Sequence, residues 1–252
     1  MAISRQQLAK ELEPGLNALF GLEYSRYDNQ HAEIYTTESS DRAFEEEVML
    51  SGFAGAPTKQ EGASVVFDQA NEAYTARYTH ETIALAFSIT EEAIEDNLYD
   101  RLAQRYTRAL ARSMSNTKQV KAAQVLNQAQ FTAVTGGDGV PLIANNHPLS
   151  NGGTFSNVLS TAADLNETSL EQALIDIQGF VDERGLKIAL NGRKMIIPKE
   201  LQFTAERLMK STLRTGTADN DINAINNMGM VPEGYRVNNF LTDTDSFFLL
   251  TD

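Results

Sequence analysis

The chain has 252 residues, a formal net charge of −13 and no cysteine. The lack of cysteine excludes disulfides, thiol nucleophiles and cysteine-based zinc sites. The acidic balance argues against a protein that grips DNA through its phosphates, because such proteins carry a basic patch.

The first 28 residues are predicted to form a helical arm. Leu8 and Leu12 lie at helical spacing after Ser4, a residue type that favours helix starts. Pro14 and Gly15 interrupt this pattern, and an apolar stripe then resumes at Leu16 and continues through Leu19 and Phe20. The arm packs either on the chain's own core or on a neighbouring copy.

Residues 29–89 are predicted to be mainly extended. A short acidic helix is expected from Ser40 to Leu50, before a turn-rich tip. Alternating side chains over residues 74–80 and 83–89 predict strands. Because residues 55–75 carry too few apolar side chains to be buried on both sides, we expect a long ribbon that leans on another surface.

The strongest helix signal covers residues 90–131. Thr90 suits the N-cap, and apolar residues recur every four positions from Ile94 to Met114. A continuous helix of this length would span roughly 60 Å at the usual rise per residue. The weak helix formers of residues 113–117 predict a bend or break there.

Four arginines on this predicted helix share one face. Their spacing of four, three and four residues places them along one side: Arg101, Arg105, Arg108 and Arg112. The stripe is either a solvated basic face or a contact with an acidic partner surface. In a chain this acidic, a second copy could supply such a surface.

Residues 132–167 are predicted to form a polar, glycine-rich loop. A helix is then expected over residues 168–184, because Thr168 and Glu171 have the spacing of a capping box and Gly185 suits the C-cap. Its expected buried face consists of Leu170, Leu174, Ile177 and Val181.

A β-hairpin is predicted after this helix. The dipeptide Asn191-Gly192 separates two apolar runs, residues 188–190 and 195–197. Asn-Gly favours the tight turns that join antiparallel strands, so the two runs are expected to pair.

The C-terminal end is predicted to hold one helix and two strands. Pro198 suits the first turn of a helix, whose inward residues are expected to be Leu201, Ala205 and Leu208. Residues 211–230 are expected to form a polar loop. The two strands are expected at residues 235–237 and 247–250.

The chain shows no catalytic motif. Its histidines, His31, His80 and His147, lie in different kinds of segment and at no local metal-ligand spacing. The glycines around Asp138 lack the Gly-Lys-Ser/Thr of a phosphate loop, and no Gly-x-Ser-x-Gly elbow occurs. We therefore predict no catalytic residue, no cofactor and no metal site.

Three stretches resemble the Mu-like major head subunits of tailed bacteriophages. The first joins Asp138–Leu142 to Asn146–Leu149, Gly152-Gly153 and Asn157; the others are Asn220–Ile225 and Leu241–Phe248. The order of the predicted elements is also similar to that of tailed-phage major capsid proteins, whose fold is named after phage Hong Kong 97. The resemblance covers nearly the whole chain.

The resemblance implies an α+β fold of the Hong Kong 97 type, with an N-arm, an extended β-hairpin loop, a long spine helix, and peripheral and axial domains. It assigns residues 1–28 to the arm, 29–89 to an extended loop lying over an adjacent subunit, 90–167 to the peripheral domain with the spine helix, 168–245 mainly to the axial domain, and 246–252 to a strand returning toward the peripheral domain. Because the family generally continues with further strands, either a C-terminal remainder is missing or this member closes differently.

The implied function is that of a non-enzymatic major capsid protein. Its copies would assemble in the host cytoplasm into the pentamers and hexamers of an icosahedral shell, and it would reside in the virion. The implied partners are a separate scaffolding protein, a portal, a cement protein, and packaged DNA without sequence-specific contacts. No membrane is involved.

Contact and hinge residues follow from the same resemblance. Contacts between subunits are expected at Phe53, Lys59, Tyr74, Arg77, Tyr78 and the four arginines of the stripe. Hinges that fit one subunit to five-fold and six-fold surroundings are expected at Gly52, Gly55, Gly62, Gly136 and Gly137. Some family members cross-link through a loop lysine, but an ordinary surface lysine is the favoured interpretation of Lys59.

Three other functions remain open from the sequence. An encapsulin-like compartment would share the fold and enclose cargo enzymes. A soluble enzyme would use the loop around His147. A filament built on the long helix would need a heptad pattern, which a spacing of four does not sustain.

Overall fold

The computed structural model describes residues 16–88, 99–150, 152–214 and 221–252. The first half of the predicted arm, the predicted N-cap Thr90 and residue Asn220 of the second resemblance stretch lie outside the described residues, as does the side chain of Arg101. The chain divides into two compact units, Met1–Thr36 with Glu81–Ala123, and Thr37–His80 with Gln124–Asp252.

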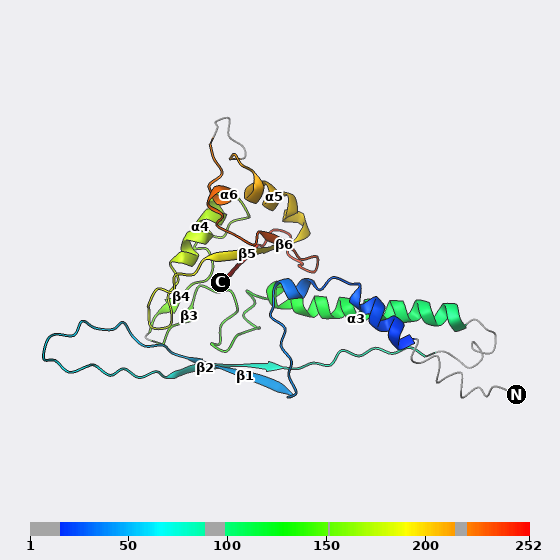
Figure 1. Ribbon diagram of the computed structural model, residues 1–252, viewed down its shortest axis with the longest axis horizontal. Helices are drawn as coiled ribbons and strands as arrows, with labels where there is room; N and C mark the ends of the chain where they lie inside the picture. The colour runs from blue at the N-terminus through cyan, green and yellow to red at the C-terminus, as the bar shows by residue number, and fades with distance from the viewer. Residues whose placement is uncertain (1–15, 89–98, 151, 215–220) are drawn as a thin grey trace. The chain divides into compact units, whose positions relative to one another are not determined.

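The first unit is built on the long helix α3 (Tyr99–Asn127), whose last four residues belong to the second unit. A helix over residues 16–25, where the arm's apolar stripe resumes, and the 3-10 helix η1 (Gln30–Glu33) lie beside α3 (Figure 1). The buried positions of α3 recur every four residues and carry small side chains: Ala103, Thr107, Ala111 and Ser115. Small side chains let neighbouring segments approach the helix axis closely.

One expectation for this helix is wrong. No break occurs at residues 113–117, because Ser115 is buried and the Thr117 hydroxyl donates to the Ser113 carbonyl at 3.0 Å, which satisfies the hydroxyl within the helix. The apolar residues that recur every four positions are only partly covered: Leu102 and Tyr106 are 36% and 49% accessible, and Leu110 and Met114 are half-buried. The buried stripe lies one position further along and consists of small residues.

The expected strand over residues 83–89 is absent from its described part. Residues 81–88 are extended but pair with no other strand. Instead Phe87 packs on Tyr106 of α3, with ring centroids 5.8 Å apart, and Glu81 forms an ion pair with Lys121. The alternating pattern is therefore used for packing along a helix.

The core of the second unit is a three-stranded sheet in the order β6-β5-β7. The central strand β5 (Gly192–Ile197) runs parallel to β6 (Tyr235–Val237) and antiparallel to β7 (Phe248–Thr251). The side chains of Met195, Ile196 and Ile197 are fully buried, as expected for a central strand covered on both faces. β6 and β7 confirm the two strands expected near the C-terminus.

Helices cover this sheet (Figure 1). They are α4 (Glu167–Gln178), the 3-10 helix η2 (Lys199–Leu201), α5 (Gln202–Lys210) and α6 (Ala224–Met228). Leu170 and Leu174 of α4 share a core cluster with Ala205 and Leu208 of α5 and with Met195. The helix expected after Pro198 is thereby confirmed, as are the inward residues Leu170, Leu174 and Ile177.

The hairpin expected at Asn191-Gly192 is wrong. Residues 188–190 form no strand, and β5 pairs with β6 and β7 from much later in the chain. Turn dipeptides report only local pairing, whereas the partners of a central strand are chosen by burial.

The caps of α4 also differ from expectation. The Asn166 side chain accepts from the Ser169 amide, and the Ser169 hydroxyl accepts from the Asn166 amide. The capping box therefore begins at Asn166, two residues before Thr168. The helix ends at Gly179, while Gly185 has a positive φ of 84° in a later turn. The expected loop over residues 211–230 contains α6, which Asn223 caps through the Asn226 amide.

Two hairpins complete the second unit. β1 (Phe44–Leu50) and β2 (Glu72–Thr79) are antiparallel, and a short pair, β3 (His147–Pro148) and β4 (Thr154–Phe155), lies within the expected loop over residues 132–167.

The acidic helix expected from Ser40 to Leu50 is wrong, because most of this range is β1. Glutamates favour a helix locally, but Glu46 accepts from Arg77 across the strand pair at 2.7 Å. Arg77 also lies 4.5 Å from the Phe44 ring centroid. Cross-strand pairs of this kind stabilise the strand.

Neighbouring residues of α4 test the assignment of the core. Leu174 is 2% exposed and Ile175 is 61% exposed. We expect Leu174→Ala to lower the free energy of unfolding by about 2–5 kcal/mol, because it leaves a cavity under β5. The control Ile175→Ala should change it by less than about 0.5 kcal/mol. Denaturant unfolding of the unassembled chain measures both, and equal effects would contradict this core.

Candidate inter-subunit surface

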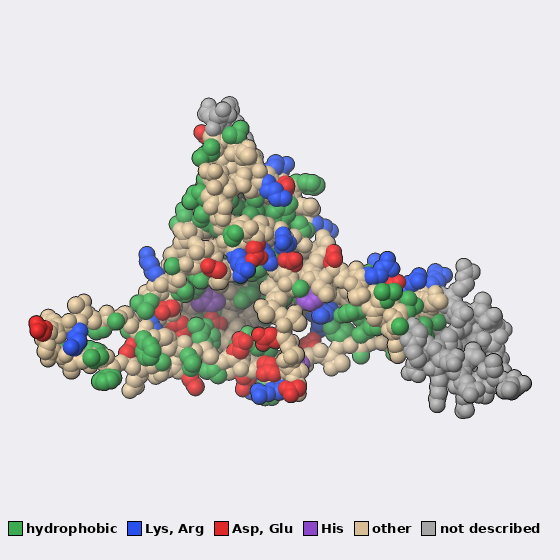
Figure 2. All heavy atoms as spheres, viewed as in Figure 1, with side chains coloured by type: hydrophobic (Ala, Val, Ile, Leu, Met, Phe, Trp, Pro, Cys, Tyr) green, Lys and Arg blue, Asp and Glu red, His purple; other side chains and the backbone are tan. Residues whose placement is uncertain are grey.

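We call residues 44–79 the ribbon: β1, β2 and the connecting residues 51–71. Many of its apolar side chains are exposed, above all Phe67 at 94%. Leu50, Phe53, Val65 and Val66 are each more than half exposed, and Figure 2 shows hydrophobic side chains over this part of the molecule. A two-stranded ribbon cannot bury such side chains against itself, and a run of exposed apolar residues marks a contact surface.

The two arms of the ribbon are hydrogen-bonded to each other just after β1 ends and just before β2 begins. Ser51 donates its amide to the Asn71 carbonyl at 2.8 Å, and Asn71 donates its amide to the Ser51 hydroxyl at 2.9 Å. Ser51 is only 3% exposed, although its neighbours in the ribbon are open to solvent. This reciprocal pair fixes the width of the ribbon at its base.

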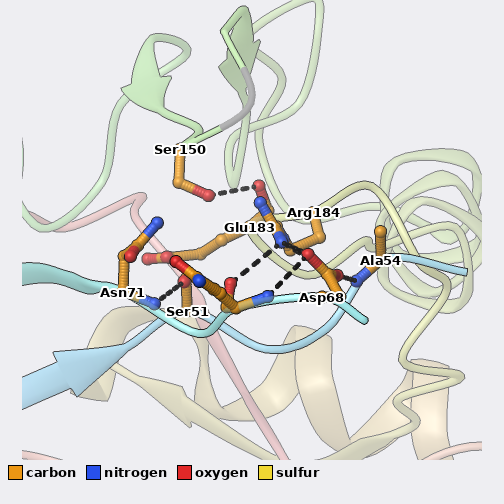
Figure 3. A network of polar contacts seen from close by, with 8 residues as sticks. Ser51, Ala54, Asp68, Asn71, Ser150, Glu183 and Arg184 are labelled. Carbon is orange, nitrogen blue, oxygen red and sulfur yellow. Dashed lines mark hydrogen bonds and ion pairs between the residues drawn. The ribbon is translucent and has the colours of Figure 1, made fainter. Parts of the chain in front are cut away.

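Asp68 connects both arms to the body of the second unit (Figure 3). Its carboxylate accepts from the Ala54 amide at 2.7 Å and from the Gln69 amide at 2.9 Å. It also accepts from Arg184, whose Nη2 lies 3.0 Å from both carboxylate oxygens. One side chain therefore joins the outgoing arm, the returning arm and the turn that follows α4.

The turn that carries Arg184 is held from within. Asp182 accepts at one carboxylate oxygen from the Arg184 amide at 2.9 Å and from the Leu186 amide at 2.8 Å. Gly185 supplies the positive φ, a conformation that glycine adopts at no steric cost. The Ser150 hydroxyl donates to the Glu183 carbonyl at 3.0 Å, which ties the turn to the loop before β4. The guanidinium of Arg184 is thus presented from a braced backbone.

A second support lies beneath β2. A Cβ built on Gly137 would come within 3.0 Å of backbone atoms of Thr75 and Ala76, so only glycine permits this approach. Next to it, the Asp138 carboxylate lies 2.6 Å from His147 Nδ1. Asp138 and His147 belong to the first resemblance stretch, which therefore begins directly after the glycine that packs against β2.

Tyr74 of β2 lies near Glu183 and Asp138 and is partly buried. Burial raises the pKa of its hydroxyl, and the negative charges of Glu183 and Asp138 raise it further. Tyr74 therefore stays neutral at physiological pH and packs as an apolar ring with a polar tip.

The contact candidates on the ribbon occupy different positions. Phe53 and Tyr78 are exposed, and Lys59 is exposed near the tip. Arg77 is engaged with Glu46 and Phe44 of β1, and Tyr74 faces the chain's own body. The structure thus brings Tyr74, Arg77 and Tyr78 together on β2. Their roles between subunits stay predictions.

The arginines of α3 also differ from one another. Arg108 lies 3.3 Å from Glu23, a nearly buried carboxylate that also pairs with Arg26 at 3.1 Å. This arginine therefore holds the helix over residues 16–25 within its own subunit. Arg105 and Arg112 are exposed, and the described part of the chain offers neither an ion-pair partner.

The candidate hinge glycines have different surroundings. A Cβ on Gly52 or Gly55 would make ordinary contacts, at 3.8 Å from Asp182 and 3.5 Å from Leu186. Gly62 has a positive φ of 81°, and a Cβ on Gly136 would lie 3.1 Å from the Asp138 carboxylate. Hinge motion at these positions stays a prediction, while Gly137 has a packing role.

Sequence reasoning missed the four residues that anchor the ribbon: Ser51, Asp68, Asn71 and Arg184. The pattern Asp182-x-x-Gly185 is a turn signal of the kind that could have located the turn. Nothing local indicates that Arg184 pairs with a residue 116 positions earlier. In the described ranges, no cluster of three or more side chains suited to a metal ion occurs, and no helix has the length and apolarity to cross a membrane.

Comparison with known proteins identifies the family. The family model described as phage capsid protein matches residues 73–252, so the chain belongs to the phage capsid protein family. No curated protein matches it in sequence.

Solved structures of bacteriophage JBD30 share its fold. The procapsid computed in I4 symmetry has a TM-score of 0.62 at 15% identity, covering 95% of this chain and 100% of that chain. The capsid decorated with minor capsid protein trimers has a TM-score of 0.62 at 13% identity, covering 86% and 92%. The JBD30 capsid has a TM-score of 0.58 at 12% identity, covering 81% and 88%.

These findings confirm the function predicted from the sequence. The chain is a bacteriophage major capsid protein that forms the icosahedral shell, and it resides in the virion capsid. Its fold is the phage capsid fold of the Hong Kong 97 type, with mixed helices and strands. The domain boundaries and the Mu-like subtype stay predictions.

Gly137→Ala tests the close approach of Gly137 to the backbone of β2. The added methyl group must displace the backbone of Thr75 or Ala76, so we expect a loss of about 1–3 kcal/mol in the free energy of unfolding. The control Gly52→Ala should be neutral or stabilising by up to about 1 kcal/mol, because its Cβ has room. Thermal unfolding of the unassembled subunit compares them, and a harmless Gly137→Ala would refute the close approach.

The pKa of Asp68 tests the anchor. The Ala54 and Gln69 amides lower it, and Arg184 lowers it further. A lowered folded pKa means that the anchor's stabilisation is complete above about pH 4, where a free aspartate titrates, and is lost as the pH falls through the lowered value.

Carboxyl NMR of the labelled subunit, titrated from neutral to acidic pH, measures this midpoint. Arg184→Met should raise it part of the way, because the two amides still donate. The control Arg193→Met should leave it unchanged. An identical midpoint in Arg184→Met would show that the ion pair is not formed in solution.

Proposed function

We propose that the chain is a Mu-like major head subunit whose ribbon lies over the adjacent subunit in the pentamers and hexamers of the shell. The observation that carries this proposal is the run Val65, Val66 and Phe67, whose side chains are 64%, 69% and 94% exposed in one copy. Exposed apolar runs of this kind favour association with a partner. Repeated around a closed ring, one such contact per copy builds a capsomer.

The roles of the other segments follow from the same proposal. Residues 1–28 act as the arm, 90–167 as the peripheral domain with α3 as its spine, 168–245 mainly as the axial domain, and 246–252 as the return strand. A scaffolding protein, a portal and a cement protein complete the head. The subunit has no catalytic role, assembles in the host cytoplasm and encloses DNA without reading its sequence.

The Mu-like subtype is supported by what the resemblance stretches do. Asn157 bridges its loop, donating to the Leu142 carbonyl at 2.8 Å and accepting from the Ala144 amide at 2.9 Å. Asn223 caps α6 and donates to the Leu208 carbonyl at 2.7 Å. These asparagines hold the loop conformations of their stretches, so the residues that carry the resemblance have structural roles in this chain.

The exposed run provides the test. We expect the triple variant Val65→Ser, Val66→Ser and Phe67→Ser to keep the free energy of unfolding of the unassembled subunit within about 0.5 kcal/mol, because these side chains touch little in one copy. We expect it to lose closed shells. Negative-stain microscopy and light scattering measure assembly.

The matched control replaces Thr58 and Gln60, polar residues of the same ribbon, with serine, and it should assemble normally. Wild-type protein that stays monomeric at high concentration, or a triple variant that forms normal shells, would refute the proposal.

A further inference from the structure

We propose that Arg184 is a positioning residue: by holding Asp68, it sets the direction in which the ribbon leaves its own subunit, and the geometry of the shell depends on that direction. The inference rests on the proposed function in one respect, because the direction matters only if the ribbon reaches a neighbour.

The outer part of the ribbon, residues 55–67, makes few interactions that could fix its path. Within residues 55–67, all of which are described, the one hydrogen bond joins the Ala63 amide to the Gln60 carbonyl at 3.1 Å. Every residue of this segment is exposed. Its path is therefore determined where it starts, at Ala54 and Asp68, and not along its length.

Asp68 holds both ends of this outer segment in place. Its carboxylate receives the Ala54 amide from the outgoing arm and the Gln69 amide from the returning arm. Arg184 binds the same carboxylate and also donates to the Gln69 carbonyl at 3.4 Å. Figure 3 shows these groups converging between the ribbon and the turn. Asp68 thus bonds to the outgoing arm at Ala54, to the returning arm at Gln69 and to the body at Arg184.

A small rotation at this point becomes a large displacement at the tip. Six or seven extended residues in each arm reach about 20 Å. A rotation of about 15° at the base therefore moves the tip by about 5 Å, which is a full strand spacing. A neighbour that must receive Phe67 in a defined place cannot tolerate such an error.

Stability alone does not explain the arrangement. Both side chains are partly open to solvent, at 19% for Arg184 and 39% for Asp68, and ion pairs of this exposure stabilise a fold only slightly. All three contacts with the ribbon are made by Nη2 of Arg184, at the end of a long side chain that leaves a braced turn, so this one nitrogen sets where the Asp68 carboxylate lies. We therefore assign Arg184 the role of setting the direction of the ribbon, and not that of stabilising the fold.

The chain offers a direct way to measure this direction. It has no native cysteine, so Gln60→Cys at the tip and Ile175→Cys on the exposed face of α4 can carry a pair of spin labels. Pulsed electron paramagnetic resonance of the unassembled subunit then gives the distance distribution between tip and body. We expect one narrow peak in the otherwise unchanged chain.

Three variants separate the possibilities. Arg184→Met keeps the unbranched apolar stem of the side chain and removes its charged group, so the narrow peak should be lost. Arg184→Lys should recover the peak only in part. Arg193→Met is the matched control, because Arg193 lies on β5, away from the ribbon, and its loss breaks a surface ion pair with Glu233. It should leave the peak intact.

Assembly completes the test. Electron microscopy of shells made from the same variants should show a broadened or irregular size distribution for Arg184→Met and a normal one for Arg193→Met. Asp68→Asn should reproduce the Arg184→Met phenotype, which guards against a folding defect specific to either variant.

The outcomes distinguish this inference from the proposed function. An unchanged distance distribution in Arg184→Met would overturn the positioning role. A broadened distribution with normal shells would overturn the claim that shell geometry depends on it. Wild-type subunits that form no shells would refute the proposed function, while the distance measurement would still decide whether Arg184 holds the ribbon.

Discussion

The structure of the ribbon depends on one carboxylate. Asp68 accepts two backbone amides from the two arms and a guanidinium from the body. A two-stranded ribbon has no core of its own, so its position must come from contacts at its base. Ser51 and Asn71 fix the width there, and Gly137 lets a loop press against β2. The remainder of the ribbon is left free to meet a partner.

The body of the subunit is arranged to provide this base. The buried strand β5 and the helices α4 and α5 form an ordinary apolar core. The turn after α4 carries Arg184 out of that core toward the ribbon, and the loop after α3 carries Asp138 and Gly137 under β2. Groups that are remote in the chain thus meet where the ribbon starts. A firm body and an exposed ribbon suit a subunit that is stable alone and yet must associate.

The sequence predicted the elements whose signals are local. The long helix, the helix after Pro198, strand β2 and the two C-terminal strands follow from periodicity and from cap or turn residues. The exposed ribbon was also predictable, because residues 55–75 have too few apolar side chains to be covered. The family followed from the order of the elements and from three short stretches, of which the first begins directly after Gly137, the glycine that packs against β2.

What the sequence could not show are contacts between distant residues. Glu45, Glu46 and Glu47 favour a helix by propensity, but here they pair with β2, which begins more than 20 residues later in the chain. The partners of β5 come from more than 35 residues later. On α3 the apolar repeat indicated the helix, but it did not indicate that the small residues Ala103, Ala111 and Ser115 are among those that are buried. Asp68 and Arg184 carry no local signal at all.

The central claim is that the exposed run of the ribbon is covered by a sister subunit in the shell. Hydroxyl-radical footprinting of Phe67 tests it most directly, because this ring is 94% exposed in a single copy. Oxidation of Phe67 is measured by mass spectrometry in unassembled subunits and in purified shells, with Phe203, exposed on α5, as an internal reference. We predict strong protection of Phe67 on assembly. Equal oxidation of Phe67 in both states would contradict the account.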